Sequence, residues 1–110
     1  RLPLNSSRMD WNQKYKLHFE PVDYSRFPCI ELAIDSVRMH KGGPAILNAA
    51  NEIAVAQFLE GKIKYIDIPK IIERCLTKIH FNSTLNYDSL AELDQQTRDY
   101  ARTICQYGTN

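Results

Sequence analysis

The stretch from residue 44 to residue 61 reads PAILNAANEIAVAQFLEG and sets the expectation for the fold. It opens with Pro44, which suits the first turn of a helix, and it closes with Gly61, which suits a helix terminus. Eleven of these eighteen residues are apolar, and a helix that is apolar on nearly every side needs cover on every side. Residues 44–61 are therefore predicted to form a buried central helix, with Ile53 and Phe58 largely buried. Replacing Phe58 by alanine is expected to cost ~3–5 kcal/mol.

Three further segments carry apolar residues at helical spacing and are predicted to pack around this centre. The first starts at Pro28 and stops at a glycine pair, the second starts with Asp67 as its cap, and the last ends at Gly108. Four helices joined by short loops predict an all-α, small four-helix bundle-like domain. The expected inner faces are Ile30, Ala33, Ile34 and Val37 in the first, Ile68, Ile71, Ile72, Cys75, Leu76 and Ile79 in the second, and Leu90, Leu93, Tyr100, Ala101 and Ile104 in the last.

Residues 1–22 have a different pattern from the rest of the chain. Tyr15, Leu17 and Phe19 alternate with polar residues, which predicts a short strand with one apolar side. No nearby segment has the pattern of a hairpin partner, and a lone strand is unstable. The chain is therefore divided into an extended arm at 1–22 and a helical domain at 23–110. The arm is expected to be bound, either folded back on the bundle, exchanged with a second copy, or laid on another part of a larger protein.

Composition excludes several classes of protein. Lys plus Arg is 14 and Asp plus Glu is 13, so there is no basic excess of the kind that nucleic-acid binding normally needs. No run of about 18 apolar residues is present to span a membrane. The three cysteines form neither a disulfide framework nor a zinc pattern, which favours a reducing compartment. The chain opens with Arg1, and its first methionine is Met9, so we expect it to be a piece of a longer protein.

Three polar side chains interrupt the central helix at a spacing that places them on one face. Asn48, Asn51 and Glu52 stand at positions i, i+3 and i+4. One interpretation makes Glu52 a metal ligand or a general base, but one carboxylate without a matching histidine or second acid is too little for a metal site. The favoured interpretation is structural, with the amides bonded to backbone of a neighbouring segment at a domain contact, because asparagine in an apolar helix is otherwise costly.

The cysteines are predicted to be packing residues. Cys29 stands at the start of a predicted helix, where the partial positive charge can lower a thiol pKa. A nucleophile also needs a base, and the candidates His18 and His40 have no evident partner in a strand and at a helix end. Cys75 and Cys105 fall on apolar stripes, which indicates packing.

A row of basic residues is the last candidate site. Lys70, Arg74 and Lys78 line one helix face and could receive an anion, although a solvated face explains them more simply. His80 ends the same helix and is expected to act as a cap. No glycine-rich phosphate loop is present. The residues alone thus predict no catalytic, cofactor-binding or metal-binding site.

Four motifs together resemble the C-terminal part of the 1-deoxy-D-xylulose 5-phosphate reductoisomerase family. They are LHFEPVD at 17–23, FPCIELA at 27–33, PAILNAANEIAVA at 44–56 and KIKYIDI at 62–68. The resemblance is tight from Leu17 to Leu76 and loose beyond it, and the Asn-Ala-Ala-Asn-Glu core with both flanks is its most specific part.

The resemblance implies an enzyme that uses NADPH and a divalent metal, Mg or Mn. Enzymes of this family convert 1-deoxy-D-xylulose 5-phosphate to 2-C-methyl-D-erythritol 4-phosphate in non-mevalonate isoprenoid biosynthesis. They carry an NADPH domain, a catalytic domain, a linker and a C-terminal helical domain. Residues 1–22 would be that linker and residues 23–110 that helical domain. The resemblance also implies that the upstream domains of the same enzyme are partners of this chain and that the parent enzyme is a homodimer. Its expected location is the bacterial cytoplasm or a plastid.

The family's functional residues do not carry over to this chain. Its glycine-rich nucleotide motif, its acidic metal ligands, its phosphate-binding residues and its lid all correspond to sequence upstream of Arg1. Its catalytic Asn and Glu flank a Lys at a different spacing, so they do not correspond to Asn48 and Glu52. The chain is therefore expected to be a structural domain that is not catalytic by itself. The alternative is an independent helical protein-interaction module with no enzyme activity.

Overall fold

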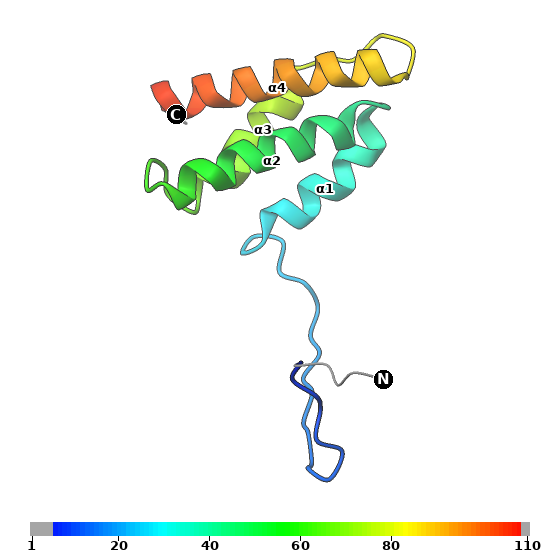
Figure 1. Cartoon of the computed structure of the whole chain (residues 1–110), viewed down its shortest axis with the longest axis vertical. Helices are drawn as coiled ribbons and strands as arrows, with labels where there is room; N and C mark the ends of the chain where they lie inside the picture. The colour runs from blue at the N-terminus through cyan, green and yellow to red at the C-terminus, as the bar shows by residue number, and fades with distance from the viewer. Residues whose placement is uncertain (1–5, 109–110) are drawn as a thin grey trace.

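Helix α2 (Gly43–Leu59) lies at the centre of the helical part of the molecule, as its composition predicts. The computed structural model describes residues 6–108. Helices α1 (Pro28–Met39), α3 (Asp67–Lys78) and α4 (Tyr87–Tyr107) surround α2, and α4 and α3 make its most extensive contacts (Figure 1). The predicted all-α class and the four helices are confirmed, with α4 ending at its Gly108 cap.

The hydrophobic core forms where α2, α3 and α4 meet. All six apolar positions predicted for the inner face around α3 are buried, so that stripe is confirmed. Ile53 is buried as expected, whereas Phe58 is only partly buried and packs edge-on against Tyr65 at the margin of the core. Thr97, which the apolar pattern did not single out, is fully buried on α4 and donates its hydroxyl hydrogen to the Leu93 carbonyl. The core residues are Ile46, Ala50, Ile53, Ala54, Ile68, Ile71, Ile72, Cys75, Leu76, Ile79, Leu93, Ala101 and Ile104.

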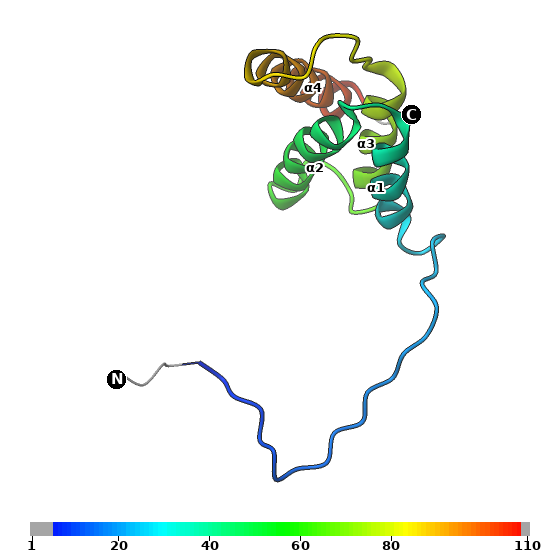
Figure 2. The ribbon, with the colours of Figure 1, turned by 90° about the vertical axis from the view of Figure 1, so that its right-hand side faces the viewer.

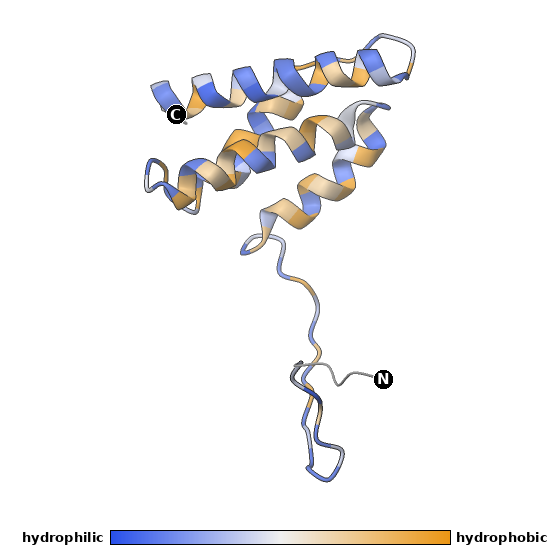
Figure 3. Ribbon diagram, viewed as in Figure 1, coloured by the Kyte–Doolittle hydropathy of each residue, from blue (hydrophilic) through white to orange (hydrophobic). Residues whose placement is uncertain are grey.

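Helix α1 forms where it is predicted but turns a different face to the core. The predicted inner stripe of Ile30, Ala33, Ile34 and Val37 is exposed, which contradicts that assignment. Ser36 is buried instead, and Cys29 and Leu32 pack against the core beside it. The Ser36 hydroxyl donates to the Ala33 carbonyl, so its burial leaves no unpaired hydroxyl. A small residue therefore lies where α1 meets α2, and the larger apolar side chains of α1 are exposed. Apolar residues recur along the ribbon of α1 in Figure 3.

The arm before α1 runs away from the bundle (Figures 1 and 2). Residues 14–23 have no assigned strand, because no neighbouring strand supplies a hydrogen-bonded ladder. The predicted short strand is therefore absent from the described residues, and the arm does not fold back on the helices. Leu17 and Phe19 keep 78% and 85% of their surface exposed. The part of the arm at residues 1–5 lies outside the described residues.

Short turns and caps fix how the helices enter the bundle. Asn86 and Ser89 form a reciprocal capping box at the start of α4. The prediction that Asp67 caps α3 is wrong, because Asp67 is the first residue of that helix and Ile66 holds the cap position without a side-chain hydrogen bond. Asp67 instead accepts a hydrogen bond from the Lys64 backbone N–H and so stabilises the turn that leads into α3. Among residues 6–108, no helix combines the length and the apolar composition that crossing a bilayer requires.

Candidate functional site

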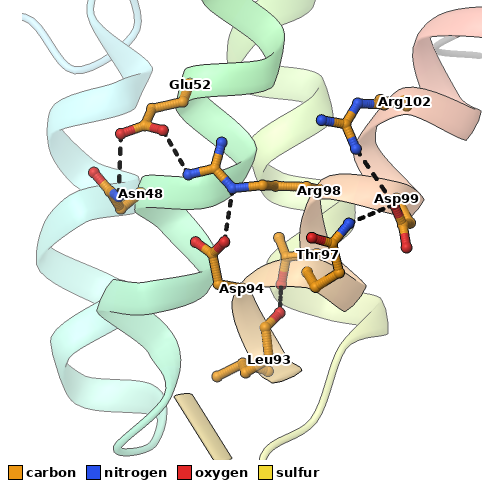
Figure 4. A network of polar contacts seen from close by, with 9 residues as sticks. Asn48, Glu52, Leu93, Asp94, Thr97, Arg98, Asp99 and Arg102 are labelled. Carbon is orange, nitrogen blue, oxygen red and sulfur yellow. Dashed lines mark hydrogen bonds and ion pairs between the residues drawn. The ribbon is translucent and has the colours of Figure 1, made fainter. Parts of the chain in front are cut away.

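The three polar residues of α2 have different surroundings. Asn48 donates a side-chain hydrogen bond to Glu52 at 3.4 Å, and Glu52 accepts from Arg98 of α4 at 2.5 Å (Figure 4). Asn51 lies toward α1, where it lines an apolar pocket with Ile30. The prediction that the amides hydrogen-bond backbone of a neighbouring segment fails for Asn48, because its partner is a side chain of its own helix.

Arg98 is the centre of this polar network. Its Nε donates to Asp94 at 2.7 Å on the same helix, while one of its terminal nitrogens reaches Glu52 on α2 (Figure 4). The Arg98 side chain is 24% exposed, less than either carboxylate. Hydrogen bonds to Asp94 and then to Glu52 raise the pKa of Arg98 above its ordinary value. Glu52 therefore forms an ion pair between α2 and α4. This pairing favours the structural interpretation of Glu52 over a role as a general base or a metal ligand.

Removing this guanidinium is expected to destabilise the bundle measurably. Arg98→Ala should lower the free energy of unfolding by ~1–2 kcal/mol, because it leaves two neighbouring carboxylates without their shared partner. Arg102 offers a matched control on the same helix, since its one described ion pair joins the exposed Asp99 at 3.3 Å. Arg102→Ala should cost less than ~0.5 kcal/mol. Urea unfolding of both variants at low and high salt checks the prediction, and equal losses for the two arginines would contradict it.

The cysteines behave as packing residues. Burial, followed by the nearby Cys105 thiol, raises the pKa of Cys75 to about 12. Burial also raises the pKa values of Cys29 and Cys105 from their ordinary value. The helix start therefore does not activate Cys29, which packs against the core margin. The predicted packing role of all three cysteines is confirmed.

Thiol labelling should reveal this protection. At pH 8 a pKa of about 12 rather than 9 reduces the thiolate fraction of Cys75 by about 1000-fold. We expect Cys75 to react with an aromatic disulfide reagent at least ~100-fold more slowly in the folded chain than in urea. Because its folded pKa is raised, the stability that this thiol contributes is full below pH 9 and declines as the pH rises toward 12. Mass spectrometry of the labelled chain identifies the cysteine, and rapid labelling of all three would contradict the prediction.

The remaining candidates do not converge on one site. Lys70 lines both a groove of about 700 Å³ between α1 and α3 and a smaller hollow near Cys105. Arg74 and Lys78 line a separate hollow beside Tyr100, and Arg74 donates a hydrogen bond to the Gly108 carbonyl. His18 is exposed beside Glu20 on the arm. His40 accepts a hydrogen bond at Nδ1 from the Gly42 backbone N–H in the turn between α1 and α2. The structure does not bring these residues into one site.

His80 is exposed just beyond α3, whose last turn carries Lys78 as its basic residue, so the expected cap by His80 is not seen. Within the part of the chain that the structure describes, no three His, Cys, Asp or Glu residues come together as a metal site would require.

Comparison with known proteins identifies the family. The family model described as the DXP reductoisomerase C-terminal domain matches residues 1–100. A 1-deoxy-D-xylulose 5-phosphate reductoisomerase of Geobacillus sp. is 40% identical over 105 residues, which are 94% of this chain and 28% of that protein. The enzyme of the same name from Shewanella woodyi is 44% identical over 93 residues, 84% of this chain and 24% of that protein.

A solved structure supports the same assignment. The 1-deoxy-D-xylulose 5-phosphate reductoisomerase from Zymomonas mobilis, in complex with NADPH, superposes with a TM-score of 0.83 and 34% identity. The match covers 96% of this chain and 28% of that one. This chain thus spans about a quarter of the length of the relatives it matches. It belongs to the DXP reductoisomerase C-terminal domain family.

Proposed function

We propose that this chain is the C-terminal structural domain of an NADPH- and metal-dependent reductoisomerase that converts 1-deoxy-D-xylulose 5-phosphate to 2-C-methyl-D-erythritol 4-phosphate. The observation that carries the proposal is the match along nearly the whole chain to one end-domain family, at about 40% identity to enzymes of that name. The NADPH complex of the Zymomonas mobilis relative supports the same cofactor for the parent enzyme.

The chemistry belongs, in this proposal, to other domains of the parent enzyme. Glu52 does not fit a divalent-metal site, because its carboxylate is paired with Arg98. Elsewhere among the described residues, no three His, Cys, Asp or Glu side chains gather as metal ligands would. This domain has a structural role: it packs against the catalytic domain and so helps to hold the shape of the enzyme. No residue of this chain is assigned to catalysis, to NADPH or to the metal.

The proposal includes the domain boundaries and the assembly. Residues 1–22 are the linker arm and residues 23–110 the helical domain, and the parent is a homodimer in a bacterial cytoplasm or a plastid. The exposed apolar side chains of the arm support a bound arm in the parent, because ordering a backbone residue costs about 1–2 kcal/mol and apolar contacts must offset that cost. An independent interaction module remains the rival function, and the relatives give it no support.

The decisive experiment compares the complete reading frame with the 110-residue chain. The complete protein should oxidise NADPH when given 1-deoxy-D-xylulose 5-phosphate and Mg²⁺ or Mn²⁺, whereas the chain alone should neither turn over nor bind NADPH by calorimetry. Amides from Tyr15 to Phe19 should exchange more slowly in the complete protein than in the chain. An inactive complete protein, or tight NADPH binding by the chain alone, would refute the proposal.

A further inference from the structure

The groove of about 700 Å³ between α1 and α3, called here the α1–α3 groove, has a partly apolar lining. Leu32 lines it from α1, and Tyr65, Ile66 and Pro69 line it at the start of α3. Tyr65 and Ile66 are mostly exposed, so nothing in the described chain covers this part of the groove. Scattered exposed apolar residues are ordinary, but apolar surface gathered in one groove marks a place for a partner.

Acidic side chains outnumber basic ones in the same groove. Glu31 and Asp35 stand one turn apart on α1, and Glu73 lines the groove from α3. None of these three carboxylates forms an ion pair with another residue of the described chain. Two cations also line the groove, of which Arg26 lies over an aromatic ring and Lys70 stands on α3. A basic segment with apolar side chains would therefore complement the groove.

The arm before α1 contains a segment of this kind. An extended backbone places Lys14 and Lys16 on one side and Tyr15, Leu17 and Phe19 on the other. Leu17 and Phe19 are almost fully exposed, and neither lysine forms an ion pair within the described part of the chain. Both the charged side and the apolar side of the segment thus lack partners in a single copy.

The spacing of the charges agrees with such a fit. Alternate residues of a strand lie about 7 Å apart, which is the separation expected between Lys14 and Lys16. Glu31 and Asp35 are four residues apart on a helix, which separates them by about 6 Å along α1. Two lysines of an arm can therefore meet two carboxylates of α1, while Leu17 on the other side of the arm faces the apolar lining at the start of α3.

The turn at Asp23 directs each arm away from its own groove. One carboxylate oxygen of Asp23 accepts hydrogen bonds from the Ser25 backbone N–H at 3.0 Å and from the Ser25 hydroxyl at 2.7 Å. The bond from the hydroxyl lowers the pKa of Asp23 from its ordinary value, so the carboxylate stays ionised at neutral pH. Pro21 restricts the residue before it to extended backbone. The arm therefore leaves the bundle (Figures 1 and 2), and a return to its own groove would require breaking this turn.

We propose that residues 14–19 of one chain lie in the α1–α3 groove of a second copy, and that the exchange is reciprocal. Lys14 and Lys16 pair with the carboxylates of α1, and a reciprocal exchange closes as a twofold dimer. The inference does not rest on the proposed function, because the arm and the groove both belong to this chain. At concentrations well below the dissociation constant the arm is released, and this is the state whose amides are compared with those of the complete protein.

Sedimentation equilibrium of the 110-residue chain measures the exchange. The chain should dimerise as its concentration rises, and high salt should weaken the dimer about threefold because exposed ion pairs are screened. Leu17→Ser should weaken it at least ~10-fold through lost apolar burial. Leu85→Ser, which alters an exposed leucine in the turn before α4, is the matched control and should leave it unchanged. A chain that stays monomeric at ~1 mM would overturn the inference. So would a dimer that Leu17→Ser does not weaken, because another surface would then hold it.

An exchange of charges tests the pairing itself. Lys16→Glu and Glu31→Lys should each weaken self-association at least ~10-fold, because like charges then meet in both grooves of the dimer. An equal mixture of these two variants should associate as well as the unsubstituted chain, since every arm then meets a groove of opposite charge. Lys41→Glu and Glu92→Lys make the same changes of charge at exposed sites outside the groove and should have no effect. A mixture as weak as the separate variants would refute the pairing.

Cross-linking distinguishes exchange between copies from folding back within one chain. A carbodiimide joins a lysine to a carboxylate that it contacts, and the reaction is run on an equal mixture of unlabelled and isotope-labelled chains. Cross-links from Lys14 or Lys16 to Glu31 or Asp35 should join labelled peptides to unlabelled ones as often as to labelled ones. Cross-links confined to peptides of the same label would show that the arm occupies its own groove, and the exchange would then be wrong.

Discussion

Replacing Ile71 by alanine is expected to lower the free energy of unfolding by about 2–5 kcal/mol. Ile71 lies on α3 with no exposed surface and belongs to the cluster that joins α2, α3 and α4. The substitution removes three carbons from a site closed on all sides, so it loses burial and leaves a cavity that the neighbouring helices cannot fill completely. A loss of this size is a large fraction of the ~5–15 kcal/mol that stabilises a typical domain.

Urea unfolding of Ile71→Ala, with Val37→Ala beside it, measures this effect. Val37 is an apolar residue of α1 that hydrophobic periodicity assigns to the inside, yet it is mostly exposed. Val37→Ala should therefore change the free energy of unfolding by less than ~0.5 kcal/mol. Comparable losses for the two variants would mean that α1 packs through its predicted stripe after all.

The contrast between α3 and α1 shows where hydrophobic periodicity is sufficient. On α3, apolar and basic residues fall on opposite faces, so only one face can be buried and the prediction is confirmed at every position. On α1, the apolar stripe is equally regular, but Ser36 occupies the buried side. Periodicity identifies an apolar face and cannot distinguish a core from an interface with another domain. Ser36 is the small residue of α1 that packs against Gly43. A small residue on one helix and a glycine on the next allow a close approach of the two backbones, and that pair indicates the buried side of α1.

The spacing of residues along α2 does not predict which partners its polar side chains bind. Asn48, Asn51 and Glu52 lie within five residues of one another, so a shared helix face was a reasonable expectation. The partner of Glu52 stands far along the chain, because Arg98 follows it by 46 residues. The crossing of α2 and α4, which the sequence pattern does not specify, decides that contact. The strand predicted for the arm fails for a related reason, because a strand requires a partner.

Introducing a methyl group at Gly43 is expected to cost about 3 kcal/mol, at the upper end of what overpacking usually costs. A Cβ built on Gly43 overlaps the carbonyl oxygen of Ser36 and lies 2.9 Å from its carbonyl carbon. Both atoms belong to the backbone of α1, so no side-chain rotation can relieve the overlap. The two helices would have to separate, which weakens the contact that holds α1 on α2.

Gly43→Ala isolates this effect because alanine favours helices over glycine by ~1 kcal/mol, so any net loss must come from the close approach. Ser36→Ala should not rescue the variant, since the clash involves the carbonyl group rather than the hydroxyl. Gly61→Ala is the control: Gly61 has a φ of 75° but nothing within 4 Å of a built Cβ, so only backbone strain of ~1–2 kcal/mol applies. Urea melts measure the losses, and hydrogen exchange should show α1 amides opening first in Gly43→Ala. A Gly43→Ala chain as stable as the unsubstituted chain would show that α1 does not pack closely on α2 at this point. The close contact that turns the apolar stripe of α1 away from α2 would then be contradicted.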